Sequence, residues 1–292
     1  MSEGRSSANS ATLGIIAGGG ELPLAIARAS VAVGRRVFVL ALEGMAKPAE
    51  VAPFPHAFVS IGELGKAIRL LKDAGCSEVT MAGKVARPEF SKLKLDTRGA
   101  LALPKIIAAA ARGDDALLRS LLAIFEKEGM RVIGSADAAD ALLVPSGPLG
   151  KIAPGPDDEA DIAYAIQVVA AMGALDIGQA AVVCKGLVLA VEAAEGTDAM
   201  LARVATLPEA LRGTQGSRKG VLVKAAKPHQ ERRVDLPVIG VRTIEFAAAA
   251  GLAGLAVEAG AALIMDRAQV VKTADRLGLF AYGFAPEDGK VG

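Results

Sequence analysis

The sequence predicts an α/β protein of two domains, the first of them a Rossmann-like domain built on a parallel sheet. In the first half of the chain, short apolar runs alternate with segments of helical periodicity, and such a β-α-β succession implies a parallel sheet with right-handed crossovers. The length of 292 residues is about that of two average domains. Because 52% of the residues are apolar, each domain can bury a core of its own.

The elements of the first half follow from the residues that begin and end them. The apolar run Leu13–Ala17 predicts a strand, three glycines break it, and Pro23 stands where a helix begins. Gly34 ends that helix and Gly75 ends a later one, because glycine readily adopts the conformation that terminates helices. The same reasoning predicts strands at 37–40, 58–61, 78–82 and 131–133, and helices at 63–74, 103–111 and 114–128.

A change of composition separates the two predicted domains. Residues 141–156 hold four prolines and three glycines, which is typical of an interdomain connection. The expected organisation is a tail over 1–11, the Rossmann-like domain over 12–140, the connection over 141–156, a mixed α/β domain of unusual topology over 157–285, and a tail over 286–292.

The second half mixes strands and helices in an order whose topology the sequence leaves open. Lys185-Gly186 between two apolar runs predicts a tight hairpin. The apolar stretch 246–265 is as long as a membrane-spanning helix, but glycines interrupt it and Glu258 lies inside it. It therefore predicts a helix, a turn and a short strand inside a folded core. Further elements are expected as strands at 181–184, 187–191 and 221–224 and helices at 157–172 and 197–206.

Charge and cysteine content exclude several classes of protein. Lys and Arg number 33 against 32 Asp and Glu, so no bulk positive charge favours a nucleic-acid partner. Two cysteines and two histidines make neither a disulfide framework nor a zinc site, so any metal would be held mainly by carboxylates, which favours Mg²⁺ or Mn²⁺. The polar first ten residues do not resemble a secretory signal, and we expect a cytoplasmic protein.

The glycine turn after the first strand is the first candidate site. Gly18, Gly19 and Gly20 place backbone N–H groups at a helix N-terminus, where a phosphate can bind. The dinucleotide fingerprint needs a further glycine where Pro23 stands, although Glu43 lies where a ribose-binding acid would be expected. An anion site, a nicotinamide site and a plain tight turn therefore remain open.

A second candidate follows the strand at 78–82. Lys84 and Arg87 come directly after this strand, and parallel-sheet enzymes bind ligands at the carboxyl ends of their strands. Both cations suit a phosphate, and a solvated surface loop is the alternative.

The densest concentration of charge lies in two segments that each follow an apolar strand of the second half. Residues 191–200 gather three carboxylates, and residues 224–237 gather cations and acids. Cleavage of a phosphoanhydride needs this mixture, since carboxylates hold a divalent ion and orient water while Lys and Arg neutralise phosphate oxygens. The alternative is that these charges are solvated helix caps and surface pairs.

Six strings in one order give the chain a family resemblance. It resembles the UDP-2,3-diacylglucosamine pyrophosphatases of lipid A biosynthesis that are unrelated to calcineurin-type metallophosphoesterases. One departure is Glu231, which stands where that family usually has Asp. The strings lie at 16–23, 83–88, 113–115, 176–179, 191–198 and 224–237.

The resemblance implies metal-dependent hydrolysis of UDP-2,3-diacylglucosamine to 2,3-diacylglucosamine 1-phosphate (lipid X) and UMP. It implies a homodimer that binds the lipid between its domains and makes transient contact with the inner membrane, at which the protein would be peripheral. Mg²⁺, or Mn²⁺ in its place, would be the cofactor. Two rivals are kept: a nicotinamide-dependent oxidoreductase and a non-catalytic protein that binds a lipid or a nucleotide sugar.

We assign roles on the basis of this resemblance. Asp235, which lies in the most distinctive string, is the principal candidate for positioning metal and water. The catalytic set is expected to be Asp235, Lys224, Lys227 and Arg233. The metal ligands are expected from Asp235, Glu192, Glu195 and Asp198. The substrate is expected to contact Gly18, Gly19, Gly20, Glu21, Lys84, Thr197 and Gln230.

Overall fold

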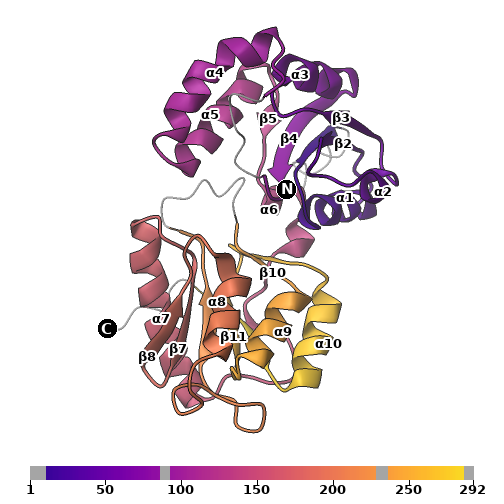
Figure 1. The fold of residues 1–292 in the computed structure, drawn as a ribbon. Coiled ribbons are helices and arrows are strands. Elements are labelled where there is room, and N and C mark those ends of the chain that lie inside the picture. The colour runs from indigo at the N-terminus through magenta and orange to yellow at the C-terminus, as the bar shows by residue number, and fades with distance from the viewer. Residues whose placement is uncertain (1–10, 86–92, 228–235, 286–292) are drawn as a thin grey trace, which may run out of the picture. The chain divides into compact units, whose positions relative to one another are not determined.

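The computed structural model describes residues 11–85, 93–227 and 236–285, and the chain divides into two compact units (Figure 1). The first unit ends at Ala141 and the second begins at Leu142. One contains a parallel sheet and the other a mixed sheet, so the predicted fold class is confirmed.

The first unit is built on a five-stranded parallel sheet in the order β3-β2-β1-β4-β5. Every strand predicted from the sequence in this half is present. Its elements are β1 (Thr12–Ala17), α1 (Leu22–Ala32), β2 (Val37–Leu42), α2 (Pro48–Val51), β3 (His56–Val59), α3 (Leu64–Asp73), β4 (Cys76–Ala82), α4 (Thr97–Ala110), α5 (Asp114–Lys127), β5 (Arg131–Val132), α6 (Ser135–Ala138) and the short helix η2 (Asp140–Leu142).

The sheet of the first unit is covered by helices that carry an apolar face toward it. Leu71 of α3 and Leu122 of α5 are fully buried in one core cluster with side chains of β2 and β4. Helix α1 contacts β1, β2 and α6, and its Ser30 hydroxyl donates to the carbonyl of Ala138 at 3.1 Å. Helix α4 begins at Thr97, six residues before the predicted start, because the carboxylate of Asp96 caps it by accepting the amide of Gly99 at 2.7 Å.

The second unit is built on a six-stranded mixed sheet in the order β6-β13-β11-β9-β7-β8. Strands β9, β11 and β13 run parallel, whereas β6, β7 and β8 each pair antiparallel with a neighbour. The elements are β6 (Gly147–Pro148), α7 (Pro156–Ala174), β7 (Ala180–Cys184), β8 (Leu187–Val191), α8 (Gly196–Ala205), β9 (Val221–Lys224), β10 (Val238–Ile239), α9 (Val241–Ala249), β11 (Gly254–Glu258), β12 (Leu263–Ile264), α10 (Arg267–Leu277) and β13 (Phe280–Phe284).

Two apolar layers enclose this sheet. Helix α7 packs on one face, and α8, α9 and α10 pack on the other. The predicted hairpin is present, with Lys185 and Gly186 at φ of 51° and 75°, the left-handed geometry that a tight hairpin turn requires. The buried carboxylate of Asp161 on α7 accepts both turn amides, from Lys185 at 2.8 Å and from Gly186 at 2.7 Å.

Two segments whose composition led to a prediction, 141–156 and 246–265, both contribute strands to the second unit. The stretch expected as an interdomain connection contributes β6, which pairs with β13 in the sheet of the second unit. The apolar stretch 246–265 forms the end of α9 and then β11, as predicted, and it adds the two-residue strand β12, which was not predicted. Among the helices that the structure describes, none combines the length and hydrophobicity needed to cross a membrane.

Candidate functional site

A buried polar network lies at one end of the second sheet. Lys224 is the last residue of β9, Glu192 follows β8 directly, and Thr197 is the second residue of α8. The register places them together, since Ala180 of β7 pairs with Lys224 on one side and accepts the amide of Glu192 at 2.8 Å on the other.

The hydroxyl of Thr197 joins the two charges. The Lys224 ammonium donates to Thr197 Oγ1 at 2.8 Å, and that hydroxyl donates to Glu192 Oε1, also at 2.8 Å. Lys224, Glu192 and Thr197 are only 6%, 7% and 9% exposed. Charges this deeply buried are costly unless they are paired and hydrogen-bonded, so the relay stabilises both of them in place.

The backbone around Glu192 is packed too closely for ordinary side chains. A Cβ on Gly178 would lie 2.0 Å from the carbonyl oxygen of Glu192, so this position requires glycine. The next residue, Gln179, donates its amide to Glu192 Oε2 at 3.4 Å. Its side-chain oxygen is buried and has no hydrogen-bond partner in the described part of the chain. A buried amide oxygen without a hydrogen-bond partner is an oxygen ligand of the type that a hard cation prefers.

Glu258 belongs to the same edge of the sheet, and the sequence analysis gave it no role. It ends β11, one residue beyond Val257, which pairs with Lys224 of the parallel neighbour β9. Its carboxylate is 7% exposed and accepts the amide of Ala226 at 3.0 Å. Ligands bind at the carboxyl ends of parallel strands, so Glu258 lies where a ligand is expected. In the sequence, the signal that could have identified Glu258 was a charged residue inside an apolar stretch.

Two of the predicted metal ligands are engaged by arginine. Glu195 pairs with Arg203 at 3.0 Å, and hydrogen bonds from its own backbone amide and from Arg203 lower the pKa of Glu195. Asp198 pairs with Arg242 at 3.0 Å. No three His, Cys, Asp or Glu side chains gather as a metal site among the described residues. The carboxylate of Glu192 instead accepts the Thr197 hydroxyl and the Gln179 amide.

The remaining residues predicted from the string 224–237 are three of the catalytic set, Lys227, Arg233 and Asp235, and the predicted substrate contact Gln230. Lys227 lies near the network in sequence, and its ammonium donates to Asp176, after α7, at 2.7 Å. Asp235, Arg233 and Gln230 lie outside the described residues, so their roles stay predictions.

Two amides of the glycine turn in the first unit are hydrogen-bonded to the backbone at the end of β4 and just after it. Gly18 donates its amide to the carbonyl of Ala82 at 2.9 Å, and Gly19 donates to that of Lys84 at 2.8 Å. A Cβ on Gly18 would lie 2.6 Å from the Lys84 carbonyl oxygen. These glycines therefore let two loops pass closely, and neither of the two amides is available to an anion. Gly20, Glu21 and the Lys84 side chain are exposed.

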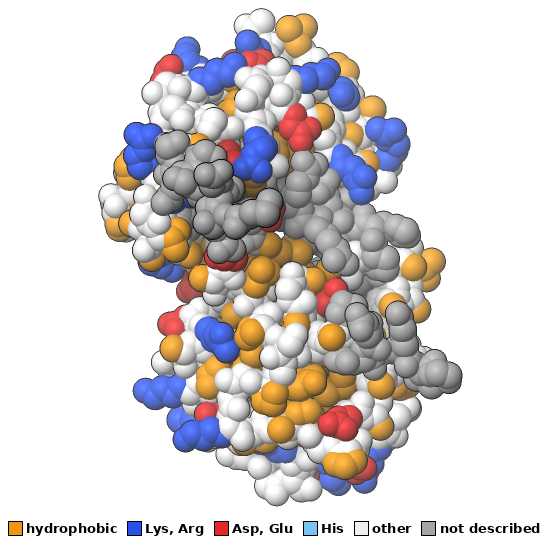
Figure 2. All heavy atoms as spheres, turned by 180° about the vertical axis from the view of Figure 1, so that it is seen from behind, with side chains coloured by type: hydrophobic (Ala, Val, Ile, Leu, Met, Phe, Trp, Pro, Cys, Tyr) orange, Lys and Arg blue, Asp and Glu red, His pale blue; other side chains and the backbone are white. Residues whose placement is uncertain are grey.

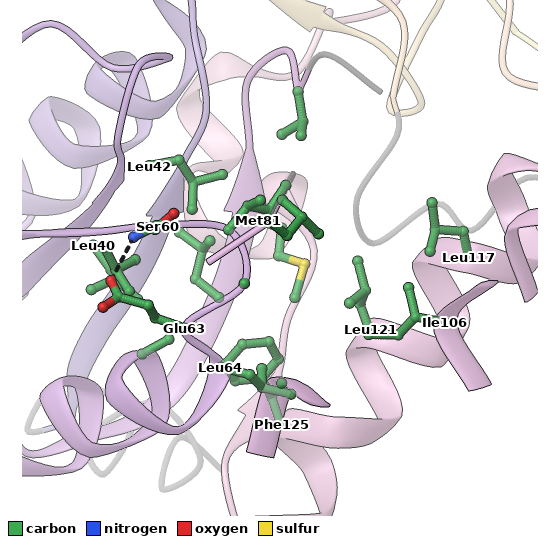
Figure 3. Close-up of a pocket in the computed structure, with 18 of the residues that line it drawn as sticks. Leu40, Leu42, Ser60, Glu63, Leu64, Met81, Ile106, Leu117, Leu121 and Phe125 are labelled. Carbon is green, nitrogen blue, oxygen red and sulfur yellow. Dashed lines mark hydrogen bonds between the residues drawn. The ribbon is translucent and has the colours of Figure 1, made fainter. Parts of the chain in front are cut away.

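The first unit contains an apolar cavity of about 450 Å³ at the carboxyl edge of its sheet (Figure 3). Leu40, Leu42 and Met81 reach it from the strands, and Ile106 and Leu121 face them from α4 and α5 (Figure 3). The volume is within the range of small-molecule sites, roughly 300–1,000 Å³.

Glu63 is the one charged residue that lines this cavity among the residues that the structure describes. Its carboxylate accepts the amide of Ser60 at 3.0 Å (Figure 3) and pairs with Lys66 at 3.0 Å. The cavity is thus suited to a hydrocarbon group rather than to an anion. The resemblance implied that the lipid binds between the domains, and the sequence analysis did not predict an apolar cavity inside the first.

On the face drawn in Figure 2, positive and negative side chains of the described residues are mixed. Figure 2 shows side chains of both signs on each unit, in agreement with the net charge of +1.

Fold and site together define a two-unit α/β protein with an apolar cavity in one unit and a buried lysine–threonine–glutamate network in the other. Family models of the LpxI N-terminal domain and the LpxI C-terminal domain match residues 12–142 and 145–282. The chain belongs to the LpxI family.

A curated relative and a solved structure complete the comparison. The chain is 53% identical over 276 residues, 94% of its length and 98% of the relative's, to a Caulobacter vibrioides protein named UDP-2,3-diacylglucosamine pyrophosphatase LpxI. The predicted resemblance and the assignment to a family of hydrolases are confirmed. A solved structure of CobK precorrin-6A reductase covers 94% of this chain and 87% of its own at 13% identity and a TM-score of 0.31, too low to bear on fold or function.

Proposed function

We propose that this protein hydrolyses the diphosphate of UDP-2,3-diacylglucosamine to 2,3-diacylglucosamine 1-phosphate (lipid X) and UMP, in the synthesis of lipid A. The observation that carries the proposal is the buried Lys224–Thr197–Glu192 network in a chain 53% identical to a named pyrophosphatase of this substrate. The two units also supply both surfaces that such a substrate needs, an apolar cavity for acyl groups and a fixed cation for phosphate.

Lys224 is proposed to stabilise the charge that develops on the departing phosphate. Thr197 holds the ammonium from one side, and Glu192 fixes the orientation of the Thr197 hydroxyl. A cation that is already oriented and shielded from water needs little reorganisation during reaction, which makes its electrostatic effect large. Lys227, Arg233 and Asp235 are proposed to act beside it, with Asp235 positioning the attacking water.

We propose that Mg²⁺, or Mn²⁺, assists this hydrolysis. Glu192 and the unsatisfied side-chain oxygen of Gln179 are hard donors of the kind these ions prefer, and Asp235 is proposed as the principal ligand. The ion would supply further charge neutralisation at the diphosphate. We expect EDTA to abolish turnover and Mg²⁺ to restore it, whereas full activity in EDTA would contradict the metal proposal alone.

The cavity of the first unit is proposed to receive an acyl chain. Leu118 of α5 lines it and is half-buried, so Leu118→Trp should fill the space without placing a charge in the core. We expect KM for the diacylated substrate to rise roughly tenfold, because part of an apolar contact area is lost. Leu118→Met is the matched control. An unchanged KM in the tryptophan variant would remove the cavity from the substrate site.

The decisive experiment compares two substrates. Purified protein with Mg²⁺ should release UMP from UDP-2,3-diacylglucosamine and not from UDP-N-acetylglucosamine. Binding of the diacylated substrate without release of UMP would favour a non-catalytic carrier, and a requirement for a nicotinamide would favour the oxidoreductase. The homodimer stays a prediction, to be tested by light scattering.

A further inference from the structure

Helix α4 of the first unit exposes an apolar face to solvent. Leu101 is 79% exposed and Ile107 is 43% exposed. A surface helix ordinarily places polar side chains on the face away from its core. Beyond the exposed Thr97 and Arg98 of its first turn, the exposed positions of this helix, termed here the α4 outer face, are Ala100, Leu101, Pro104, Lys105, Ile107 and Ala108.

The opposite side of the same helix lines the cavity. Leu103 and Ile106 are among the cavity-lining residues, so α4 separates the cavity from solvent. Two other lining residues reach the surface nearby, since Val85 is 47% exposed and Leu95, two residues before α4, is 38% exposed. The cavity rim therefore includes an exposed apolar side chain, Leu95, two residues before the beginning of α4.

The charges that accompany this face are mostly basic. From Lys94 to Arg112 the chain has four basic residues, of which Arg98 pairs with Glu128, and a single acid, Asp96. That acid is occupied in capping α4 and in accepting the amide of Lys66 at 2.9 Å. Exposed apolar side chains flanked by cations are the pattern of helices that lie in the interface of anionic bilayers.

We propose that the α4 outer face docks on the surface of an anionic lipid bilayer, so that an acyl chain passes from the bilayer to the cavity behind the helix. The proposal rests on the proposed function only for the identity of the lipid that is taken up. A second copy of the chain fits this face less well, because a two-fold contact would bring the same cations together without an acid to pair them.

Vesicle flotation tests the docking directly. The full-length protein is mixed with vesicles of phosphatidylglycerol or of phosphatidylcholine. We expect binding to phosphatidylglycerol, and we expect the double variant Leu101→Gln/Ile107→Gln to lower the partition coefficient roughly tenfold to hundredfold through loss of buried apolar area. Lys105→Gln should lower it about fivefold, on phosphatidylglycerol only. The matched control is Leu175→Gln/Leu187→Gln, which removes equally exposed apolar side chains from the second unit and should leave binding unchanged.

Activity separates docking from catalysis. With substrate in detergent micelles the Leu101/Ile107 variant should keep its rate, whereas with substrate in phosphatidylglycerol vesicles it should lose the rate in proportion to binding. No flotation of the unchanged protein, or equal loss in the control variant, would overturn the proposal. A dimer that becomes a monomer in the Leu101/Ile107 variant would assign the face to a second copy and overturn it too. Flotation without hydrolysis would refute the proposed function and leave the docking supported.

Discussion

The cavity of the first unit and the polar network of the second are built on opposite principles. The described lining of the cavity is mostly apolar, and Glu63, the one charged residue in that described lining, is held by Ser60 and Lys66. The network instead buries an ammonium and a carboxylate joined through a hydroxyl. Apolar surfaces tolerate exchange for others of similar volume, whereas a buried charge depends on each of its partners. The two regions should therefore respond very differently to single substitutions.

The largest expected effect is on Lys224. Lys224→Met keeps the length of the side chain and removes its charge, so electrostatic stabilisation of the reaction is lost. We expect kcat to fall roughly 10²–10³-fold, the usual consequence of removing one preorganised group of this kind. UMP release under saturating substrate measures it.

The control for this variant is Lys219→Met, two residues before β9 and exposed. It changes the net charge equally and should leave kcat within a factor of about two, since surface substitutions seldom propagate to a buried site. Near wild-type kcat in Lys224→Met, with the fold intact by circular dichroism, would exclude the network from catalysis.

A smaller effect is expected where a buried charge has only a structural role. Asp161 holds the β7–β8 hairpin by accepting two amides, and Asp161→Ala leaves both without an acceptor. We expect a loss of about 2–3 kcal/mol in the free energy of unfolding, confined to the second unit. Hydrogen exchange resolved by peptide would show faster exchange in β7 and β8 and no change in β1 to β5. Asp157→Ala, an exposed change in the same helix, should be neutral. An equal loss in both variants would mean that the hairpin amides are not the cause.

The fold followed from the sequence because its signals are local. Hydrophobic runs, the Pro23 helix start and the Lys185-Gly186 turn each act within a few residues, and the structure has an element at each. The start of α4 was missed because the cap, Asp96, lies ahead of any periodic apolar signal. Strand β6 was missed because it consists of Gly147 and Pro148, two residue types that disfavour strands. It forms a strand because it pairs with β13, which is distant in the sequence.

The site was predicted less completely than the fold, because its contacts are not local in the sequence. The residues of the network were chosen from charge-rich segments, but which charges meet depends on strand register and helix placement. Glu195 and Asp198 belong to the same segment as Glu192, yet Glu195 pairs with Arg203 further along α8 and Asp198 pairs with Arg242 of α9. Glu258 was recognised only as a charge within an apolar run, because its place beside β9 is fixed by the sheet order. The apolar cavity could not be predicted, since its lining comes from many separate elements.

The smallest expected effect comes from the two thiols, which report on the units separately. Cys76 in the first unit and Cys184 in the second are both buried and unpaired. Burial raises the pKa of Cys76 to about 11. Burial, followed by the charge of Asp161, raises the pKa of Cys184. At pH 8 both thiols should resist iodoacetamide in the folded protein and react readily in denaturant.

Their pH dependence follows from linkage. An unfolded thiol releases its proton near pH 8.5, whereas folded Cys76 keeps it to about pH 11, so the unfolded state binds fewer protons between these values. Stability of the first unit should therefore fall slightly as pH rises from 8.5 to 10, and Cys76→Ala should flatten that fall. Asp161→Ala should speed alkylation of Cys184 and leave Cys76 unchanged, because only Cys184 lies near the carboxylate and its hairpin. Equal acceleration at both thiols would show that the two units unfold together rather than independently.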